Sequence, residues 1–426
     1  MTASARVQHP RRGTCPGLSA PMPTGDGLLV RLVPIGTVPL AAFAQLCAAA
    51  RTFGNGVIEV TSRGSIQVRG LTAASAPDFA ASVATLGIKA EDGVPVICNA
   101  LAGLDAAEIF DAAAFGTDLR PALARQSMAA KLGAKVSVVI DSGGALGLDA
   151  IAADIRLCAQ AVNGTVVLRI AVGGDGVSAV QLGNVASERG VEAAVRLLDI
   201  IARRGREVRA RDIAASVFRA TIADLLVSAH PRAVSPRARD AIGLHKLKDQ
   251  SLACGIGLAF GHADATSLER LVAAAAACGA NGLRTAPDRA LMVIGLTAGT
   301  APAFAAAAGQ LGFIVHADDP RRHVIACAGA PICASAYIAS RAIAPRIAAA
   351  VASSRYGAFT IHLSGCAKGC AHAAPAALTV VGTPNGCALI ANGLARDTPF
   401  AVVAADELPA AIAKYARQHV SGTDHV

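Results

Sequence analysis

The sequence contains no tryptophan, and aromatic residues make up only 3% of its 426 positions. Proteins that hold single-stranded nucleic acid stack bases on aromatic side chains, so this composition disfavours that function. The chain also shows no helix-turn-helix, zinc-finger or RNP-like pattern. Apolar runs such as LVAAAAACGA are interrupted by Gly, Asn or Arg before they reach the roughly eighteen residues of a membrane span. We therefore expect neither a nucleic-acid partner nor a membrane.

The N-terminus has two adjacent arginines, Arg11 and Arg12, but no apolar segment after them, which is unlike a secretory signal. This favours the cytoplasm, where eleven cysteines would serve metals more than disulfides. The formal net charge is +9. A solvated basic surface explains such an excess without a ligand. The alternative is a polyanionic ligand, because a basic site concentrates an acidic substrate, and a small molecule with many carboxylates fits better than nucleic acid.

One pattern occurs twice, more than two hundred residues apart. Each copy predicts a strand, a helix and two further strands around a turn. Thr266 or Ser267 is expected to cap the second helix, and Gly279 to end it. The strand pairs of both copies open with Asn-Gly and close with Gly-Leu-Thr, so we interpret the pattern as an internal duplication. The predicted elements lie at 25–34, 39–54 and 55–72, and again at 255–264, 266–279 and 281–297.

A second α/β block is predicted after each copy, with PRAVSPRARD (231–240) as a linker. A chain of this length is expected to form several domains. We predict an α+β protein of four units, at 12–100, 126–230, 241–315 and 320–426.

Four cysteines lie in two close pairs near the end of the chain. Five residues separate Cys327 from Cys333, and three separate Cys366 from Cys370. A 4Fe-4S cluster takes four thiolates, and two such pairs can converge on one cluster. Zinc is one alternative, although structural zinc pairs have roughly two to four residues between ligands. Four buried and inert thiols are the other.

The cysteine pattern, with SGCAKGC as its second half, resembles the cluster motif of the nitrite and sulfite reductase family. The segments RRGTCPGLSAPMPTGDGLLVRL and SGCAKGCAHAAPAALTVVG resemble a branch of that family that acts in cobalamin biosynthesis. The similarity runs from about Arg12 to the end. It implies that two ferredoxin-like half-repeats pair into one domain, with two pseudo-symmetric α/β blocks beside it and the ligand between all three.

The resemblance also implies an activity. Members of this branch are oxygen-dependent oxidoreductases that hydroxylate the tetrapyrrole precorrin-3A and close a γ-lactone. The implied cofactors are a 4Fe-4S cluster on the four cysteines and a further mononuclear iron, with NADH and O2 as co-substrates. An electron-donating reductase is a candidate partner. The alternative functions are a sirohaem-dependent nitrite or sulfite reductase, and a protein that only carries electrons or senses redox state.

Six residues are candidates for contacts to the substrate. In the reductases, a turn with Thr-x-Arg and a Gln four residues further on contacts sirohaem carboxylates, and Thr61, Arg63 and Gln67 match it. Arg289 occupies a nearly equivalent turn in the second copy, and guanidinium groups grip carboxylates bidentately. An ordinary surface arginine is the alternative at each position. The six candidates are Arg31, Arg63, Gln67, Lys131, Arg284 and Arg289.

Two positions depart from the reductases. Lys131 matches the first of two closely spaced sirohaem lysines, but the second position is Gly133, and Val94 stands where the reductases have an arginine. These departures favour a related macrocycle as substrate over bound sirohaem. Among the histidines, His362 and His372 flank the second cysteine pair, where either could bind another iron. His245, His262 and His323 are further candidates, and a structural role is the alternative for all five.

Overall fold

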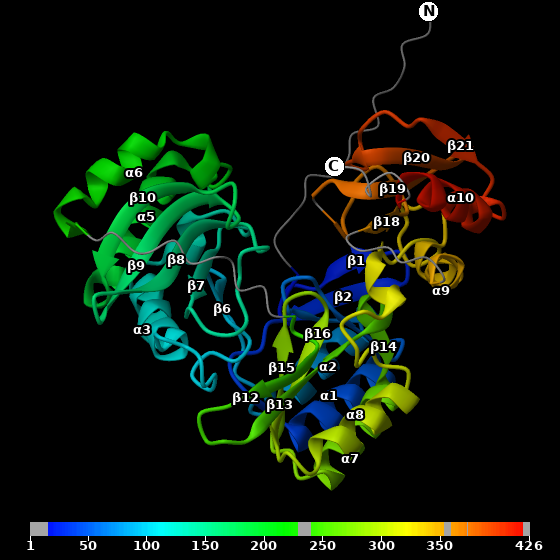
Figure 1. Ribbon diagram of the computed structural model, residues 1–426, viewed down its shortest axis with the longest axis horizontal. Coiled ribbons are helices and arrows are strands. Elements are labelled where there is room, and N and C mark those ends of the chain that lie inside the picture. Colours follow the sequence, from blue (N-terminus) through cyan, green and yellow to red (C-terminus); the bar gives the residue numbers. More distant parts are fainter. Residues whose placement is uncertain (1–15, 229–239, 353–358, 373, 421–426) are drawn as a thin grey trace, which may run out of the picture.

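The computed structural model describes residues 16–228, 240–352, 359–372 and 374–420. It confirms an α+β fold, built on four sheets. In Figure 1 the two half-repeats (blue and yellow-green) lie together, and the two α/β blocks (green and orange) stand apart on either side above them. The start of the predicted unit 12–100, nearly all of the linker 231–240 and residues 421–426 lie outside the described residues, and the predicted boundaries stay predictions.

The first half-repeat has the predicted order of strand, helix and two strands. Its strands bury alternate side chains, because successive residues of a strand face opposite sides of a sheet. Val30, Ile58 and Val68 enter the core, whereas Arg31 and Glu59 face the other side. The elements are β1 (Met22–Thr24), β2 (Gly27–Leu32), β3 (Val38–Pro39), α1 (Leu40–Phe53), β4 (Val57–Val60), β5 (Ile66–Leu71) and α2 (Ser75–Ala84).

The second half-repeat follows the same order. Asp264, not Thr266 or Ser267, caps its first helix: the Asp264 carboxylate accepts a hydrogen bond from Ser267 N at 2.8 Å. A carboxylate there also complements the positive end of the helix dipole. Gly279 directly follows the helix C-cap with φ +79°, as predicted. The elements are β12 (Gly243–Lys246), β13 (Leu252–Gly257), β14 (His262–Asp264), α7 (Ala265–Ala277), β15 (Gly282–Ala286), β16 (Ala290–Leu296) and α8 (Ala301–Gln310).

The half-repeats pair by exchanging one short strand each. β14 of the second copy pairs with β4 of the first, and β3 of the first pairs with β15 of the second. The resulting sheets have the orders β1-β2-β5-β4-β14 and β12-β13-β16-β15-β3. Phe43 of α1 and Phe304 of α8 lie fully buried in one core that both copies share. Burying such a ring contributes roughly 1.5–3 kcal/mol, so neither copy keeps its whole core without the other.

A close contact between the asparagine of Asn-Gly and the glycine of Gly-Leu-Thr explains why both copies share these residues. Gly70 and Gly295 have φ +71° and +91°, a region that favours glycine. A Cβ on Gly70 would lie 2.5 Å from the Cβ of Asn55, and one on Gly295 would lie 2.8 Å from the side chain of Asn281. The two copies therefore preserve the same tight contact between the ends of their strand pairs.

The first α/β block is a six-stranded sheet covered on one face by helices. α5 buries Leu197, Leu198 and Ile201, which recur at helical spacing. The strand order is β11-β10-β9-β8-β7-β6. The elements are β6 (Val96–Cys98), α3 (Ala112–Arg125), α4 (Met128–Lys131), β7 (Val138–Asp141), β8 (Ala153–Val162), β9 (Thr165–Gly174), β10 (Val180–Ala186), α5 (Gly190–Arg204), α6 (Ala215–Thr221) and β11 (Leu226–Val227).

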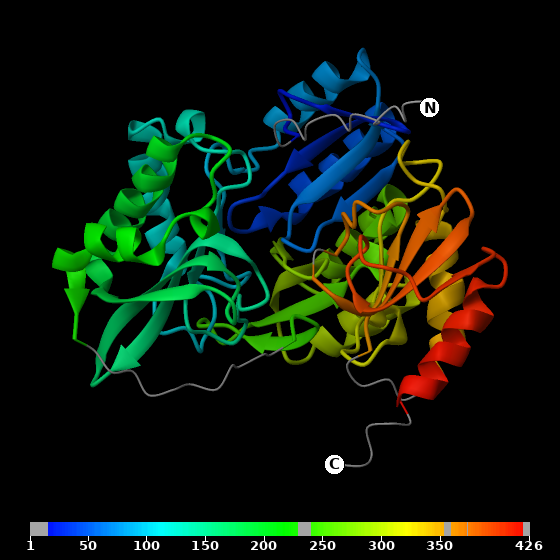
Figure 2. The same ribbon diagram turned by 90° about the horizontal axis from the view of Figure 1, so that it is seen from above.

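The second α/β block repeats the central topology of the first. β17 and β18 are parallel, β18 and β19 are parallel, and β20 returns antiparallel. β6 to β9 have the same pattern. Viewed from above, the two blocks lie on opposite sides of the paired repeats (Figure 2). The elements are β17 (Val324–Ala326), α9 (Ser340–Val351), β18 (Ile361–Ser364), β19 (Ala376–Thr383), β20 (Gly386–Gly393), β21 (Ala401–Val403) and α10 (Leu408–Val420).

Short 3-10 turns complete the secondary structure, at Ser187–Arg189, Ala210–Asp212, Ala223–Leu225, Ala259–Gly261 and Pro320–His323. Within the described ranges, no helix has the length and apolar character needed to cross a bilayer.

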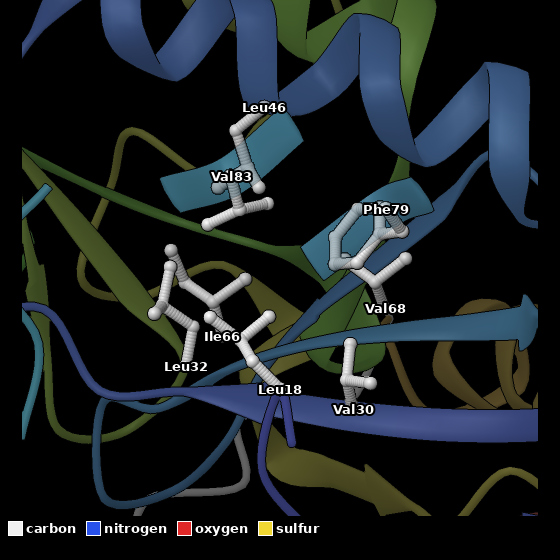
Figure 3. A pocket seen from close by; sticks show the side chains of 8 residues that line it. All are labelled: Leu18, Val30, Leu32, Leu46, Ile66, Val68, Phe79 and Val83. Carbon is white, nitrogen blue, oxygen red and sulfur yellow. The ribbon is translucent and has the colours of Figure 1, made fainter. Parts of the chain in front are cut away.

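Figure 3 shows an apolar gap between the first sheet and helices α1 and α2. Only apolar side chains line it, so it offers nothing to orient a polar ligand and belongs to the core. The lining residues are Leu18, Val30, Leu32, Leu46, Ile66, Val68, Phe79 and Val83.

Candidate functional site

The cysteine loops start from the same edge of a parallel sheet. Cys327 directly follows β17, and Cys366 comes two residues after the neighbouring strand β18. Because the strands are parallel, their carboxyl ends meet at one edge. Gly365 N donates a hydrogen bond to Cys327 Sγ at 3.0 Å, and Cys327 Sγ donates to Ser340 Oγ at 3.6 Å. A hydrogen bond to a ligand sulfur, such as that from Gly365 N, tunes the potential of a bound cluster.

The rest of the two loops is joined by backbone hydrogen bonds. Tyr337 N, beyond Cys333, donates to Gly365 O at 2.8 Å, and Cys333 N donates to Gly329 O at 2.7 Å. A Cβ on Gly365 would lie 2.6 Å from Ala336 Cβ, so only glycine fits between the loops. Gly369 has φ +58°. Close packing thus explains the glycine at 365, and a positive φ explains the glycine at 369.

Exposure separates the motif cysteines from the buried ones. Cys370 is exposed, and the other three are partly exposed. By contrast, Cys47 and Cys254 are buried, and burial raises the pKa of Cys254 to about 11 and raises that of Cys47 as well. A metal ligand must be a thiolate, so the buried thiols are poor candidates.

The four motif thiols do not form a ready-made ligand set. Across the described ranges, no three His, Cys, Asp or Glu side chains lie close enough together to hold a metal ion. The common sheet edge of the four cysteines and the hydrogen bond from Gly365 N to Cys327 Sγ fit a cluster. The cluster itself stays a prediction.

His362 lies on β18, beneath the second cysteine loop, and is fully buried. Its ring centroid is 5.6 Å from that of His372. Burial, with smaller contributions from His372 and Arg289, lowers the pKa of His362 to about 4, so the ring is neutral at neutral pH. Neither ring nitrogen has a hydrogen-bond partner in the described part of the chain. Two imidazoles suit iron, but two ligands alone do not complete a mononuclear iron site.

The other candidate histidines lie elsewhere. His245 lies on β12, and its Nε2 is 3.1 Å from the carbonyl oxygen of Ala241. His262 lies on β14, where burial lowers its pKa to about 4. His323 is partly buried in a 3-10 turn.

Arg31 and Gln67 come together on the polar face of the first sheet. With its amide oriented to satisfy both neighbours, Gln67 accepts hydrogen bonds from Arg31 Nη2 at 2.7 Å and Nε at 3.1 Å. It donates to Glu59 Oε2 at 2.9 Å. These residues face one another across β2, β5 and β4. Glu59 was not among the residues predicted from the sequence. The available signal was its charge between two buried apolar residues of an alternating strand, which indicates that it faces away from the core.

The equivalent turns of the two copies also meet, as expected of a paired duplication. Asp288 N donates to Ser62 O at 3.0 Å. Arg63, which is exposed, donates to Ala152 O at 3.0 Å, in the loop between β7 and β8. Arg289 donates to Ala371 O at 3.0 Å, in the loop between β18 and β19. Each arginine thus reaches the corresponding loop of the α/β block that follows its own copy.

Arg284 and Lys131 are placed differently. Arg284 is partly buried, and donates to Thr37 Oγ1 at 2.8 Å and to the carbonyl oxygens of Ala100 and Ala102 at 3.2 and 2.8 Å. Lys131 is exposed at the end of α4, which packs on α3 and α5. Lys131 therefore lies on the first α/β block, whereas the other five candidates lie on the half-repeats.

The first block contains a cysteine-free counterpart of the cluster site. Asn99 follows β6 as Cys327 follows β17, and Asn99 Oδ1 accepts from Ser142 N at 2.6 Å as Cys327 Sγ accepts from Gly365 N. In the glycine-rich loop after β7, Asp141 Oδ2 accepts from Leu148 N at 2.8 Å. The segment DSGGALGLD is therefore held by side chains of the protein, at the position where the second block carries its cysteines.

Three comparisons with known proteins show which proteins this chain resembles. The nitrite/sulfite reductase ferredoxin-like half domain matches residues 20–86, which contain β1 to α2. A precorrin-3B synthase of Sinorhizobium sp. is 40% identical over 412 residues, or 96% of this chain and 89% of that protein. The structure of the Mycobacterium tuberculosis NirA protein aligns with 93% of this chain and 82% of its own, with a TM-score of 0.77 and 18% identity. The last comparison shows a shared fold.

Proposed function

The chain belongs to the precorrin-3B synthase family, and we propose that it converts precorrin-3A by oxygen-dependent hydroxylation and γ-lactone formation. The observation that carries the proposal is the 40% identity over 96% of the chain. In the balanced reaction, one atom of O2 enters the macrocycle and the other leaves as water. Two electrons and two protons are required. We propose that NADH supplies the two electrons and one proton, either directly or through a reductase, and that the second proton comes from solvent.

Two positions of the fold support precorrin over bound sirohaem. A Cβ on Gly133 would lie 2.4 Å from Arg206 O, so a lysine does not fit there without a shift of the backbone. Val94 is buried in the core of the first α/β block. The chain thus lacks two cationic side chains that the reductase resemblance implies, and the places for them are filled by packing.

We propose that Cys327, Cys333, Cys366 and Cys370 hold a 4Fe-4S cluster. When bound, the cluster would supply electrons one at a time. The protein's part is to hold Cys327 Sγ beside Gly365 N, which donates a hydrogen bond to it, and beside the hydroxyl of Ser340.

A serine series tests the ligands. Replacing any one of the four cysteines by Ser should remove most of the iron and sulfide and the broad brown absorption of protein purified without oxygen. Cys278→Ser is the matched control, because Cys278 is only partly buried and lies outside the motif. A Cys366→Ser protein with an unchanged spectrum and about four iron per chain would remove Cys366 from the ligand set.

Charge and position suggest how the macrocycle would be held. We propose that Arg31, Gln67, Arg63 and Lys131 contact its carboxylates, since Arg31 is held in place by Gln67 and the side chains of Arg63 and Lys131 are exposed. Arg284 and Arg289 already donate to backbone carbonyls. We propose that these two shape the site by fixing its loops.

The direct test is turnover. Anaerobically purified protein with precorrin-3A, NADH and ¹⁸O₂ should give a product that carries one labelled oxygen atom, as read by mass spectrometry. Intense macrocycle bands in the protein as purified, together with reduction of nitrite or sulfite, would replace this proposal by the sirohaem reductase.

Arg63→Ala separates an enzyme from an electron carrier. Arg63 donates to Ala152 O, on the block that lacks the four-cysteine motif, so the cluster's redox behaviour should persist while the KM for precorrin-3A rises. Arg289→Ala is less suitable, because Arg289 contacts the loop that carries Cys370. Unchanged affinity in Arg63→Ala would remove Arg63 from the substrate site.

A further inference from the structure

Glu59 is the centre of a charge network between the first half-repeat and the cysteine-bearing block. Its Oε1 accepts from Arg341 Nη2 and lies 3.7 Å from Arg69 Nε, while its Oε2 accepts from Gln67. Only 12% of the Glu59 side chain is exposed, against 6% for Arg69 and 15% for Arg341. Asp26 pairs with Arg69 at 3.0 Å. The carboxylate therefore compensates cations that have largely lost their contact with water.

The two arginines lead from Glu59 to the two ends of the first cysteine loop. Arg69 Nη2 donates to the carbonyl of Ile332 at 3.3 Å, and Ile332 directly precedes Cys333. Arg341 directly follows Ser340, whose hydroxyl contacts Cys327 Sγ. One carboxylate on β4 is thus linked to each cysteine of the first pair through an arginine and one further residue.

The position of Arg341 is unfavourable without Glu59. Arg341 is the second residue of α9 (Ser340–Val351), where the helix dipole disfavours a cation. The same dipole favours an anionic cluster beside the helix start, next to Cys327. Glu59 offsets the cost of the arginine and, through it, fixes the N-terminus of α9 against the sulfur.

We propose that Glu59 is a positioning residue that sets the geometry of Cys327 and Cys333 through Arg341 and Arg69. The proposal rests on the cluster assigned under the proposed function. Glu59 itself does not touch a cysteine. Loss of its charge should loosen the loop from 327 to 341 and change the properties of the cluster without preventing its assembly.

The test compares Glu59→Gln with Glu269→Gln in the full-length protein after anaerobic reconstitution with iron and sulfide. Glu269 forms an ion pair with Arg51 at 2.5 Å, so its replacement removes the same charge from the same paired repeats at a site without a cysteine loop. We expect Glu59→Gln to lose its cluster to an iron chelator about tenfold faster than wild type, because local opening becomes more frequent. Its reduction potential should shift, while Glu269→Gln behaves as wild type.

A charge cycle and a cluster-free measurement complete the test. Arg341→Gln should reproduce the effect, and Glu59→Gln with Arg341→Gln should cost less than the sum of the two, since the double variant leaves no unpaired charge. In cluster-free protein, Glu59→Gln should speed hydrogen exchange at the amides of Cys333 and Tyr337. Arg341→Gln also serves if Glu59→Gln does not fold.

The outcomes separate the two proposals. A Glu59→Gln protein with wild-type cluster loss, potential and amide exchange would overturn the positioning role and leave the cluster untouched. A wild-type protein that takes up no iron would overturn the cluster assignment together with the effect on its potential. Faster exchange in cluster-free Glu59→Gln would then still support Glu59 as the residue that orders the loop.

Discussion

At the scale of single residues, Arg284 is a partly buried cation that donates hydrogen bonds to neutral acceptors, namely Thr37 Oγ1 and two backbone carbonyls. Burial lowers its pKa, with Glu108 acting in the opposite sense. Its guanidinium joins β15 to the loop at Ala100 and Ala102. Glu59 occupies the equivalent position on β4, since β14 and β3 pair with β4 and β15 in the same register. One position of the duplicated strand thus anchors a different α/β block in each copy.

Arg284→Ala should destabilise the protein by about 2–3 kcal/mol, because two carbonyl groups lose a charged donor. Urea unfolding followed by circular dichroism measures the change. Arg51→Ala is the matched control, since Arg51 is half exposed and its ion pair with Glu269 is worth about 0–1 kcal/mol. An Arg284→Ala protein of normal stability with a raised KM would instead assign Arg284 to the substrate.

His262 predicts a specific acid sensitivity. Burial lowers its pKa from 6.5 to about 4, with Arg341 adding to the effect. Between these values the unfolded chain binds a proton that the folded chain does not, so stability is full above pH 6.5 and falls as the pH drops towards 4. His262→Gln should remove up to about 3 kcal/mol of this loss. Unfolding free energies at several pH values measure the slope, and an unchanged slope relative to wild type would refute the assignment. The exposed His316→Gln is the control.

At the scale of elements, the close contact between a glycine of β5 or β16 and the asparagine before the partner strand is a shared feature of the two copies. Gly70→Ala and Gly295→Ala should each destabilise by about 2 kcal/mol or more, because a side chain would be strained at positive φ and would collide with Asn55 or Asn281. Thermal unfolding provides the measurement. Gly299→Ala is the control, as its nearest neighbour to a new Cβ is 3.8 Å away. Tolerance of either substitution would mean that the loop relaxes away from the asparagine.

The elements were predictable from the sequence because their patterns are local, whereas the site depends on contacts between distant elements. Alternation of apolar residues is local, so the strands, the helix and the duplication in 25–72 and 255–297 followed from the sequence. The exchange of β3 and β14 did not, since two- and three-residue strands carry no periodicity. Nor did the pairing of Glu59 with Arg341, which are separated by 282 positions. A side chain's partner on a distant element leaves no local pattern.

At the scale of the whole molecule, the two α/β blocks attach to the paired repeats in different ways. Leu101 and Leu146 of the first block pack with Met292 of the second half-repeat in one buried apolar cluster. Polar contacts such as Arg341 to Glu59 join the cysteine-bearing block to the repeats. Such polar contacts are weaker than a shared core and are sensitive to salt. The placement of the cysteine-bearing block is therefore the property of this fold that solution conditions affect first.

The net charge of +9 leads to a prediction for the complete enzyme. A substrate with several carboxylates is attracted by the field of the whole protein, which salt screens over about 10 Å at 0.1 M. The KM for precorrin-3A should rise about tenfold between low salt and roughly 0.5 M NaCl, with kcat nearly constant. Arg63→Gln should flatten this dependence if Arg63 touches a carboxylate. Arg204→Gln removes the same charge from the exposed end of α5, so an equal effect of both would mean that net charge, not the site, attracts the substrate.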